Sequence, residues 1–306
     1  MGANSEESSK QYSPREVFVR GVLMGLAELV PGVSGGTIAF ISGIYYQLVS
    51  ALSSFGPLSF KLAMQPRQFW LHHHLGFLLA LVVGMVAGIL VFARLIGFMM
   101  EAAEPVLWAF FFGVIAVSVL QIGAARAPRY LAAYGALGVL AGLLFLSLPS
   151  VDMSESMFAL FVAGMVAVSA WILPGISGSF VLLLLGLYDD VILAVNQLDW
   201  TFLLVLTGGC GSGLLLFTRA LGWLLMRYED ALLAFLTGFM ATALIKLWPW
   251  QIVASQSAPD AFGIFHILQS PQQYAAAGGE AYLGLSLMAA LLGGAGIWLL
   301  STLSPQ

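Results

Sequence analysis

Charge is scarce in this sequence. Only 8% of its 306 residues are Asp, Glu, Lys or Arg, whereas 60% are hydrophobic, and the mean hydropathy is +0.96. A soluble globular domain carries about 25% charged residues. The composition therefore excludes a soluble domain and predicts an integral membrane protein. The net charge of −4 says little about partners, because most charges lie in loops; no nucleic acid is expected among them.

Cysteine is also nearly absent. The one cysteine, Cys210, lies inside an apolar run, which excludes a disulfide framework and a cysteine-based metal site. We expect neither a bound metal nor a cofactor. The sequence has no basic segment followed by a short apolar segment near its start, so no removable signal peptide is expected. Residues 1–14 are polar and are predicted to form a disordered cytoplasmic tail.

The sequence contains several long apolar runs. Several reach the length of about 20 residues that a helix needs to cross a bilayer. Their continuity favours helices over a membrane barrel. The expected single spans lie at 74–98, 105–124, 130–148, 202–226, 231–250 and 282–303. The predicted fold class is therefore an all-α polytopic membrane protein.

Two similar hexapeptides, PGVSGG at 31–36 and PGISGS at 174–179, interrupt further apolar segments. Proline ends a helix and glycine allows tight turns. If segments 15–52 and 157–195 each cross the membrane once, the basic residues divide evenly between its sides. If each is a re-entrant hairpin, eight of them fall on one side and the opposite loops carry none. The positive-inside rule favours the hairpins and places both termini in the cytoplasm.

The two halves of the chain are related by an internal repeat. An offset of 143 aligns hairpin 1 (15–52) with hairpin 2 (157–195), and an offset of 125 aligns the two spans that follow each hairpin. Repeat 1 is thus 15–124 and repeat 2 is 157–250. The span at 130–148 separates them, so they are predicted to be inverted, as in many transporters. Residues 251–281 form the expected extracytoplasmic loop before the last span.

A half-helix that begins at membrane depth presents free N–H groups and a partial positive charge, which together favour an anion. Serine hydroxyls in the hexapeptides, and the hydroxyl of Thr37 directly after the first, would add donors. A kink that only packs against its neighbours remains the alternative. The residues predicted to bind a phosphate headgroup are Gly32, Ser34, Gly35, Gly36, Thr37, Gly175, Ser177, Gly178 and Ser179.

Charged residues inside apolar segments are the other candidates. Arg94 and Arg219 match in the repeat, and an arginine in a span is costly unless it is paired or hydrated. Each could hold a headgroup phosphate on one access side, or pair with Glu104 and Glu229, which also match. Glu28, close to the first hexapeptide, could carry a coupling proton or serve as a structural partner.

At these residues the sequence resembles a known family. PGVSGGT in the first half, and PGISGSF followed by LLLLGLY in the second, are similar to the paired signatures of the bacterial polyprenyl-phosphate transporters, over about residues 15–303. The resemblance implies a flippase that returns undecaprenyl phosphate across the cytoplasmic membrane toward the cytoplasm. The inverted repeats suggest that it does so by alternating access. Its partners would be this lipid and the surrounding membrane lipids. Proton or ion coupling and a homo-oligomer are left open.

Two other functions remain as alternatives. Membrane-embedded undecaprenyl-pyrophosphate phosphatases carry a similar PGxSRS motif with a glutamate-rich motif. Here Ser34 is followed by Gly35 and Ser177 by Gly178, and no ExxxE cluster accompanies them, so the charge that phosphoryl transfer needs is lacking. A small-anion channel or exporter would use the same helix ends but would need a continuous wet pore.

Overall fold

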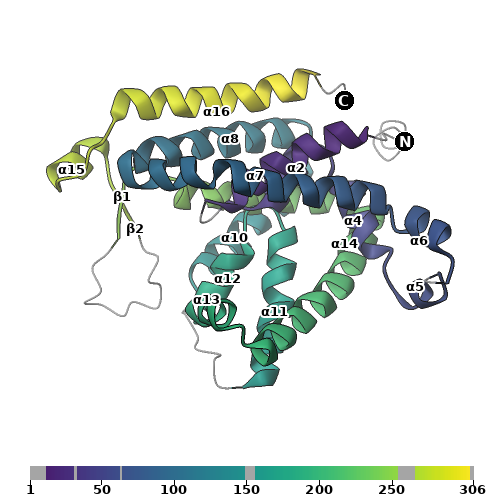
Figure 1. The fold of residues 1–306 in the computed structure, drawn as a ribbon. Coiled ribbons are helices and arrows are strands. Elements are labelled where there is room, and N and C mark those ends of the chain that lie inside the picture. Colours follow the sequence, from purple (N-terminus) through teal and green to yellow (C-terminus); the bar gives the residue numbers. More distant parts are fainter. Residues whose placement is uncertain (1–11, 31–32, 63, 149–155, 254–265, 304–306) are drawn as a thin grey trace.

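The structure is a computed structural model that describes residues 12–30, 33–62, 64–148, 156–253 and 266–303. Within these ranges nearly every element is a helix (Figure 1). Four helices are long and apolar enough to cross a membrane, or up to six if each of two bent helix pairs counts as one span. This confirms the predicted all-α polytopic membrane fold.

Hairpin 1 consists of α2 (Pro14–Glu28), α3 (Gly35–Ile41) and α4 (Tyr45–Ser53). The chain bends by 120° between α3 and α4. Gly43 has a φ of 77°, which a residue with a Cβ rarely adopts. Ser13 caps α2 and Pro14 is its first residue, so ordered structure begins inside the tail expected at 1–14; residues 1–11 lie outside the described ranges.

Hairpin 2 has the same plan, with α11 (Met157–Ile172), α12 (Gly178–Leu184) and α13 (Tyr188–Gln197). Here α12 and α13 are bent by 106°, and Gly186 at the bend has a φ of 67°. The offset of 143 relates Gly186 to Gly43. The two hairpins therefore bend at equivalent residues.

The spans after hairpin 1 are α7 (Leu75–Ala102) and α8 (Glu104–Ala124). Two short helices, α5 (Pro57–Leu62) and α6 (Pro66–His72), precede them. The predicted span at 130–148 is built from α9 (Pro128–Tyr130), the π-helical η1 (Leu131–Gly135) and α10 (Ala136–Leu146).

The predicted spans at 202–226 and 231–250 are joined in one kinked element, α14 (Trp200–Lys246). A straight helix of 47 residues would be about 70 Å long at 1.5 Å per residue. The apolar core of a bilayer is only about 30 Å thick. Tyr228 breaks the helix with φ −136° and ψ 40°, so the turn between the two spans occurs at one residue without a separate loop.

The segment expected as a loop at 251–281 contains regular structure. Strands β1 (Gln251–Val253) and β2 (His266–Leu268) pair antiparallel, and α15 (Pro271–Ala276) follows. The indole nitrogens of Trp248 and Trp250 donate to the carbonyls of Gln269 and Ala281, at 2.8 Å each. The last helix, α16 (Leu283–Leu303), packs along α8. Its described apolar part, Leu283–Leu299, is shorter than the four helices that are long enough to cross a membrane.

Glycines let the long helices approach closely. A Cβ on Gly84 would collide with the carbonyl oxygen of Phe18, where α7 crosses α2. A Cβ on Gly209 would likewise collide with the carbonyl oxygen of Phe161, where α14 crosses α11. The two offsets relate both pairs, so the repeat found in the sequence extends to equivalent contacts. That the repeats have opposite orientations in a membrane stays a prediction.

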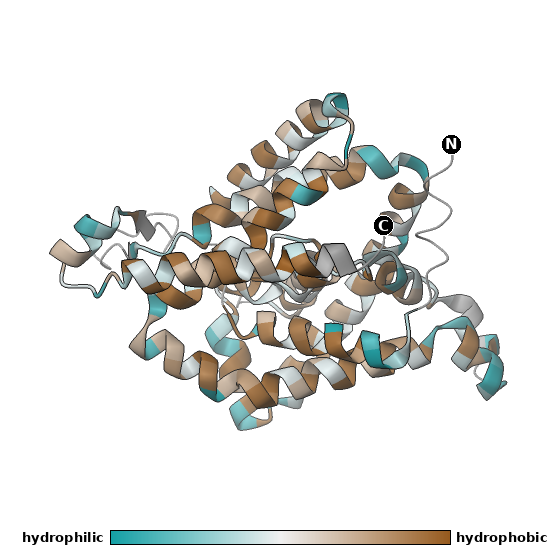
Figure 2. Ribbon diagram, turned by 90° about the horizontal axis from the view of Figure 1, so that it is seen from above, coloured by the Kyte–Doolittle hydropathy of each residue, from teal (hydrophilic) through white to brown (hydrophobic). Residues whose placement is uncertain are grey.

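The outward surface is apolar, as contact with lipid requires. Leu90 and Val91 of α7 are 73% and 68% exposed. Figure 2 shows hydrophobic residues along the long helices and hydrophilic ones gathered near their ends. The buried core lies where the two hairpins meet the second half of α14, around Met24, Leu48 and Met240.

Candidate functional site

The broken ends of the two hairpins meet inside the protein. We call residues 33–37 tip 1 and residues 171–179 tip 2. The hydroxyl of Ser34 donates to the carbonyl of Trp171 at 2.9 Å, and the Gly175 N–H donates to Thr37 Oγ1 at 2.9 Å. Ser34 and Thr37 are almost fully buried. The structure thus joins predicted site residues from the two halves of the chain.

A carboxylate completes this junction from hairpin 1. Glu28 Oε1 accepts hydrogen bonds from the Gly35 N–H and from the Trp171 indole N–H, both at 2.6 Å. The Gly36 N–H donates to Ser34 Oγ at 3.1 Å. The first free N–H groups of α3 are therefore satisfied by groups of the protein itself, and the protein's own carboxylate occupies the place where an anion was predicted to bind.

Tip 2 is built differently. The offset of 143 places Trp171 where hairpin 1 has Glu28, so tip 2 lacks an equivalent carboxylate. The hydroxyls of Ser177 and Ser179 lie 2.7 Å apart and bond to each other, and the Ser177 side chain makes no capping hydrogen bond to α12. Ser177 is buried and Ser179 is exposed.

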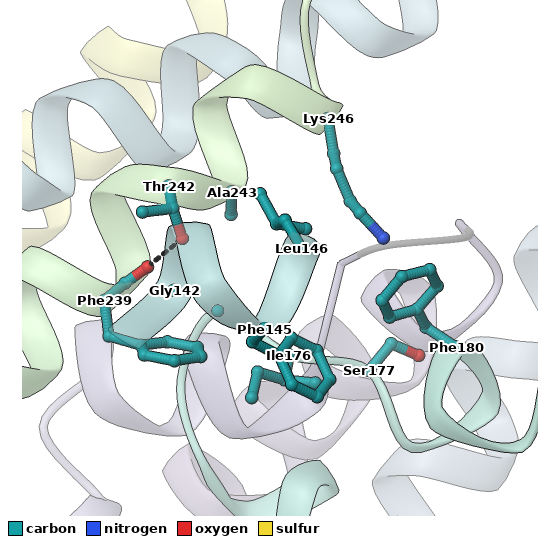
Figure 3. A pocket seen from close by; sticks show the side chains of 11 residues that line it. Gly142, Phe145, Leu146, Ile176, Ser177, Phe180, Phe239, Thr242, Ala243 and Lys246 are labelled. Atoms are coloured by element: carbon teal, nitrogen blue, oxygen red, sulfur yellow. Dashed lines mark hydrogen bonds between the residues drawn. The ribbon is translucent and has the colours of Figure 1, made fainter. Parts of the chain in front are cut away.

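A narrow pocket lies beside tip 2, with about 280 Å³ of empty space including the part open to solvent (Figure 3). It is lined by Gly142, Phe145, Leu146, Gly175, Ile176, Ser177, Phe180, Phe239, Thr242, Ala243 and Lys246. Most of these residues are apolar. Among the described residues, serine, threonine and lysine supply its polar side chains, and the lysine is the only charged one.

Lys246 reaches into this pocket from the end of α14 (Figure 3). Its ammonium nitrogen lies 2.6 Å from the centre of the Phe180 ring, a cation–π contact. Within the described part of the chain, no Asp or Glu forms an ion pair with it. Its position also suits an interfacial lysine beside Trp248 and Trp250, so sequence reasoning did not select it. One feature of the sequence could have identified it: the offset of 125 aligns Lys246 with the uncharged Gln121, so the two repeats differ in charge at this position.

The two arginines in the spans lie away from the tips. Arg94 is exposed on α7. Arg219 is exposed on α14, and its guanidinium donates to the carbonyl of Phe55. Glu104, which could have paired with Arg94, accepts a hydrogen bond from the Trp108 indole at 2.9 Å. Among the described residues, Arg94 forms no ion pair with Glu104, so the alternative of a structural pair is not supported for that arginine.

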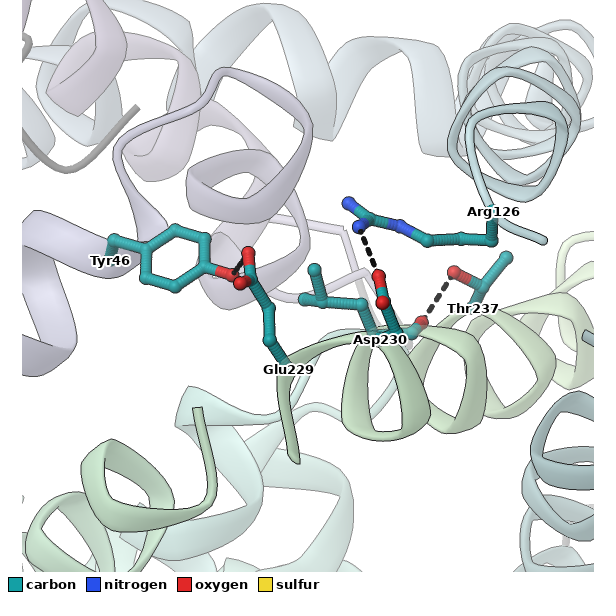
Figure 4. Close-up of polar contacts among 6 residues, drawn as sticks. Tyr46, Arg126, Glu229, Asp230 and Thr237 are labelled. Carbon is teal, nitrogen blue, oxygen red and sulfur yellow. Dashed lines mark hydrogen bonds and ion pairs between the residues drawn. The ribbon is translucent and has the colours of Figure 1, made fainter. Parts of the chain in front are cut away.

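The kink of α14 is held from two directions (Figure 4). Glu229 accepts a hydrogen bond from the Tyr46 hydroxyl of hairpin 1 at 2.5 Å. Asp230 forms an ion pair with Arg126, which follows α8, at 3.3 Å. Both carboxylates come directly after Tyr228. The kink is thereby connected to hairpin 1 and to the first repeat's last span.

The remaining site predictions concern backbone. Gly32 and the neighbouring Pro31 lie outside the described residues. Gly35, Gly36 and Gly178 are buried at the starts of α3 and α12. Each of these helices has only seven residues, about two turns. Hydroxyls and the lysine are therefore stronger candidates for holding an anion than the dipoles of these short helices.

Comparison with known proteins places the chain among lipid-phosphate transporters. A family described as undecaprenyl phosphate translocase-like matches residues 24–262. A Vibrio cholerae protein named polyprenyl-phosphate transporter is 38% identical over 254 residues, covering 80% of this chain and 80% of that protein. A Staphylococcus aureus protein of the same name is 28% identical over 254 residues, covering 76% and 85%. No solved structure matches the chain.

Proposed function

Because the chain belongs to the undecaprenyl phosphate translocase-like family, we propose that it is a flippase for a polyprenyl phosphate such as undecaprenyl phosphate. It would move the phosphate headgroup from one leaflet of the bacterial cytoplasmic membrane to the other. The polyprenyl chain would stay in lipid, against the apolar outer faces of the helices.

The observation that supports this function is the buried contact between the two tips. Non-helical backbone at membrane depth is tolerated where it is buried in protein or lines a cavity. Here Ser34, Thr37 and Glu28 bond across to tip 2. Such a junction is a barrier between the two sides of a membrane, and in transporters with interrupted helices the substrate binds at the equivalent place.

Alternating access follows as the proposed mechanism. If one repeat rocks against the other, the tips part on one side while the opposite side stays closed. The kink at Tyr228 gives α14 a place to bend, and Glu229 ties that kink to Tyr46 of hairpin 1. The exposed Arg94 and Arg219 would attract an arriving anionic headgroup from the membrane surface, one for each side, before it reaches the tips.

The test is transport in proteoliposomes. Undecaprenyl phosphate added to one leaflet should appear in the other only when the protein is present. Arg94→Ala and Arg219→Ala should slow its appearance, whereas Arg67→Ala, which removes an exposed arginine of α6, should not. Equal rates in all three variants would reject the role of the two arginines.

Two further results would reject the proposed flippase itself. Release of inorganic phosphate from undecaprenyl pyrophosphate would indicate a phosphatase. An anion conductance without lipid movement would indicate a channel.

A further inference from the structure

We propose that the pocket beside tip 2 is the phosphate-binding site, with the Lys246 ammonium as its cation and the Ser177 and Ser179 hydroxyls as its donors. The ligand group is a phosphate monoester carried on an apolar chain. This inference rests on the proposed function and names the residues that would hold the headgroup.

The ammonium of Lys246 is the first argument. It reaches a pocket lined mostly by aromatic and aliphatic side chains, where it contacts the Phe180 ring. Lys246 is half-buried, and among the described residues no carboxylate forms an ion pair with it. The Phe180 ring attracts the ammonium by a cation–π contact but supplies no negative charge to neutralise it. An anionic ligand would compensate it.

The hydroxyls are the second argument. Among the described residues the Ser177 and Ser179 side chains bond to each other, so turning both toward a phosphate would give up one hydrogen bond. Thr242, the other hydroxyl of the pocket, already donates to the Phe239 carbonyl at 2.6 Å (Figure 3). Ser177 and Lys246 line the same pocket, and the Ser179 hydroxyl lies 2.7 Å from that of Ser177. A phosphate monoester has enough acceptor oxygens for these three groups.

The rest of the pocket limits what can enter. Its walls are apolar, and its enclosed space is only about 10 Å³, room for about one water molecule. A phosphate headgroup would enter only if the lining side chains move apart, and the polyprenyl chain would have to remain outside. Since the walls offer few polar groups, a phosphate attached to a sugar or another hydrophilic group would be poorly accommodated.

The difference between the two repeats is the third argument. The offsets relate Lys246 to Gln121 and Trp171 to Glu28. At these matched positions repeat 1 has a carboxylate and a glutamine, while repeat 2 has a tryptophan and a lysine. A phosphate would be repelled by the Glu28 carboxylate in repeat 1 and attracted by the Lys246 ammonium in repeat 2. The structure therefore supports one phosphate site per chain, on the side of hairpin 2.

The test measures lipid binding to the full-length protein in detergent, with undecaprenyl phosphate, inorganic phosphate and uncharged undecaprenol as separate ligands. Lys246→Gln should weaken undecaprenyl phosphate binding by about tenfold or more, because a hydrogen bond to a charged group is lost. Lys246→Arg should retain most of the affinity. Lys61→Gln, which removes an exposed lysine of α5, should leave it unchanged. Undecaprenol should bind equally to all variants.

The outcomes separate this inference from the proposed function. If Lys246→Gln binds and transports undecaprenyl phosphate as well as the wild type, the pocket is not the phosphate site, but the proposed flippase function is unaffected. Failure of the wild-type protein to move the lipid would overturn the flippase. Inorganic phosphate that binds as tightly as the lipid would show a free-anion site and would overturn the headgroup assignment. Melting temperatures without ligand identify any variant that is merely misfolded.

Discussion

At the scale of single residues, Glu28 is the most constrained polar group of the junction. Its Oε1 accepts two N–H groups, one from its own hairpin and one from Trp171 of the other. Hydrogen bonds to a carboxylate are roughly twice as strong as bonds between neutral groups. Glu28 thus joins the tips and also keeps negative charge at tip 1.

Glu28→Ala should lower the free energy of unfolding by about 1–3 kcal/mol, because it leaves the Gly35 and Trp171 N–H groups without their acceptor. Trp171→Phe removes only one of the two bonds and should cost less. Thermal denaturation of the purified variants in detergent measures both effects. The combined variant should lose less than the sum of the two losses, since the substitutions share one bond. Simple additivity would show that Glu28 and Trp171 do not interact.

The sequence identified part of this site. Proline, glycine and serine in an apolar segment marked both tips, and Ser34, Thr37 and Gly175 do meet there. Their partners could not be predicted, because the contact between Ser34 and Trp171 depends on how two distant hairpins pack. Lys246 was missed because a lysine beside tryptophans at the end of a span is typical of a membrane interface. The headgroup roles of Arg94 and Arg219 remain predictions.

At the scale of elements, the paired crossings of α2 with α7 and of α11 with α14 determine how each hairpin is held. In membranes, small residues let helix backbones approach, and packing replaces the hydrophobic effect as the driving force. Gly84 and Gly209 stand at equivalent points of these crossings. Each hairpin can therefore pack closely against the span that follows it because a glycine, which has no side chain, stands at the crossing.

Gly209→Leu should destabilise the protein by about 1–3 kcal/mol or prevent its folding, since the added side chain has to push α11 away from α14. Gly211→Leu is the matched control on the same helix, because a Cβ there meets nothing within 4 Å. That variant should be as stable as the wild type or slightly more stable, as leucine favours helix over glycine. The two variants are compared by their yield and melting temperature after solubilisation. If both lose the same amount of stability, the close contact of α11 with α14 at Gly209 is not what the substitution disturbs.

Elements with a strong apolar pattern were predictable, and the others were not. The spans that became α7, α8 and α16 follow from continuous runs of apolar residues. The short helices α5 and α6 and the strands β1 and β2 carry no such run, and their formation depends on contacts with the rest of the chain. The sequence placed a turn between the spans at 202–226 and 231–250, but that Tyr228 alone would make it could not be predicted, because tyrosine is not a residue that breaks helices by itself.

At the scale of the whole molecule, the two repeats contact each other at their tips and are connected again at the kink of α14. Ser34 is fully buried in the tip contact, whereas Ser179 is exposed. A state in which the tips have parted would make Ser34 accessible. Accessibility at these two positions therefore reports on movement of one repeat against the other.

In a Cys210→Ser background, Ser34→Cys should react slowly with a water-soluble maleimide and faster while undecaprenyl phosphate is being transported. Ser179→Cys should react at a similar rate with and without the lipid. Mass spectrometry of the labelled protein gives both rates. If Ser34→Cys reacts as fast as Ser179→Cys in the absence of lipid, the tips do not form the barrier proposed here.

The unequal tips also have a kinetic consequence. A duplicated protein with two equal sites that both had to be filled would show a rate that rises cooperatively with lipid density. If the proposed pocket beside tip 2 is the single phosphate site, each chain carries one lipid per cycle. The initial rate in proteoliposomes should then saturate hyperbolically, with a Hill coefficient near one. A sigmoidal curve would require a second site or coupled chains.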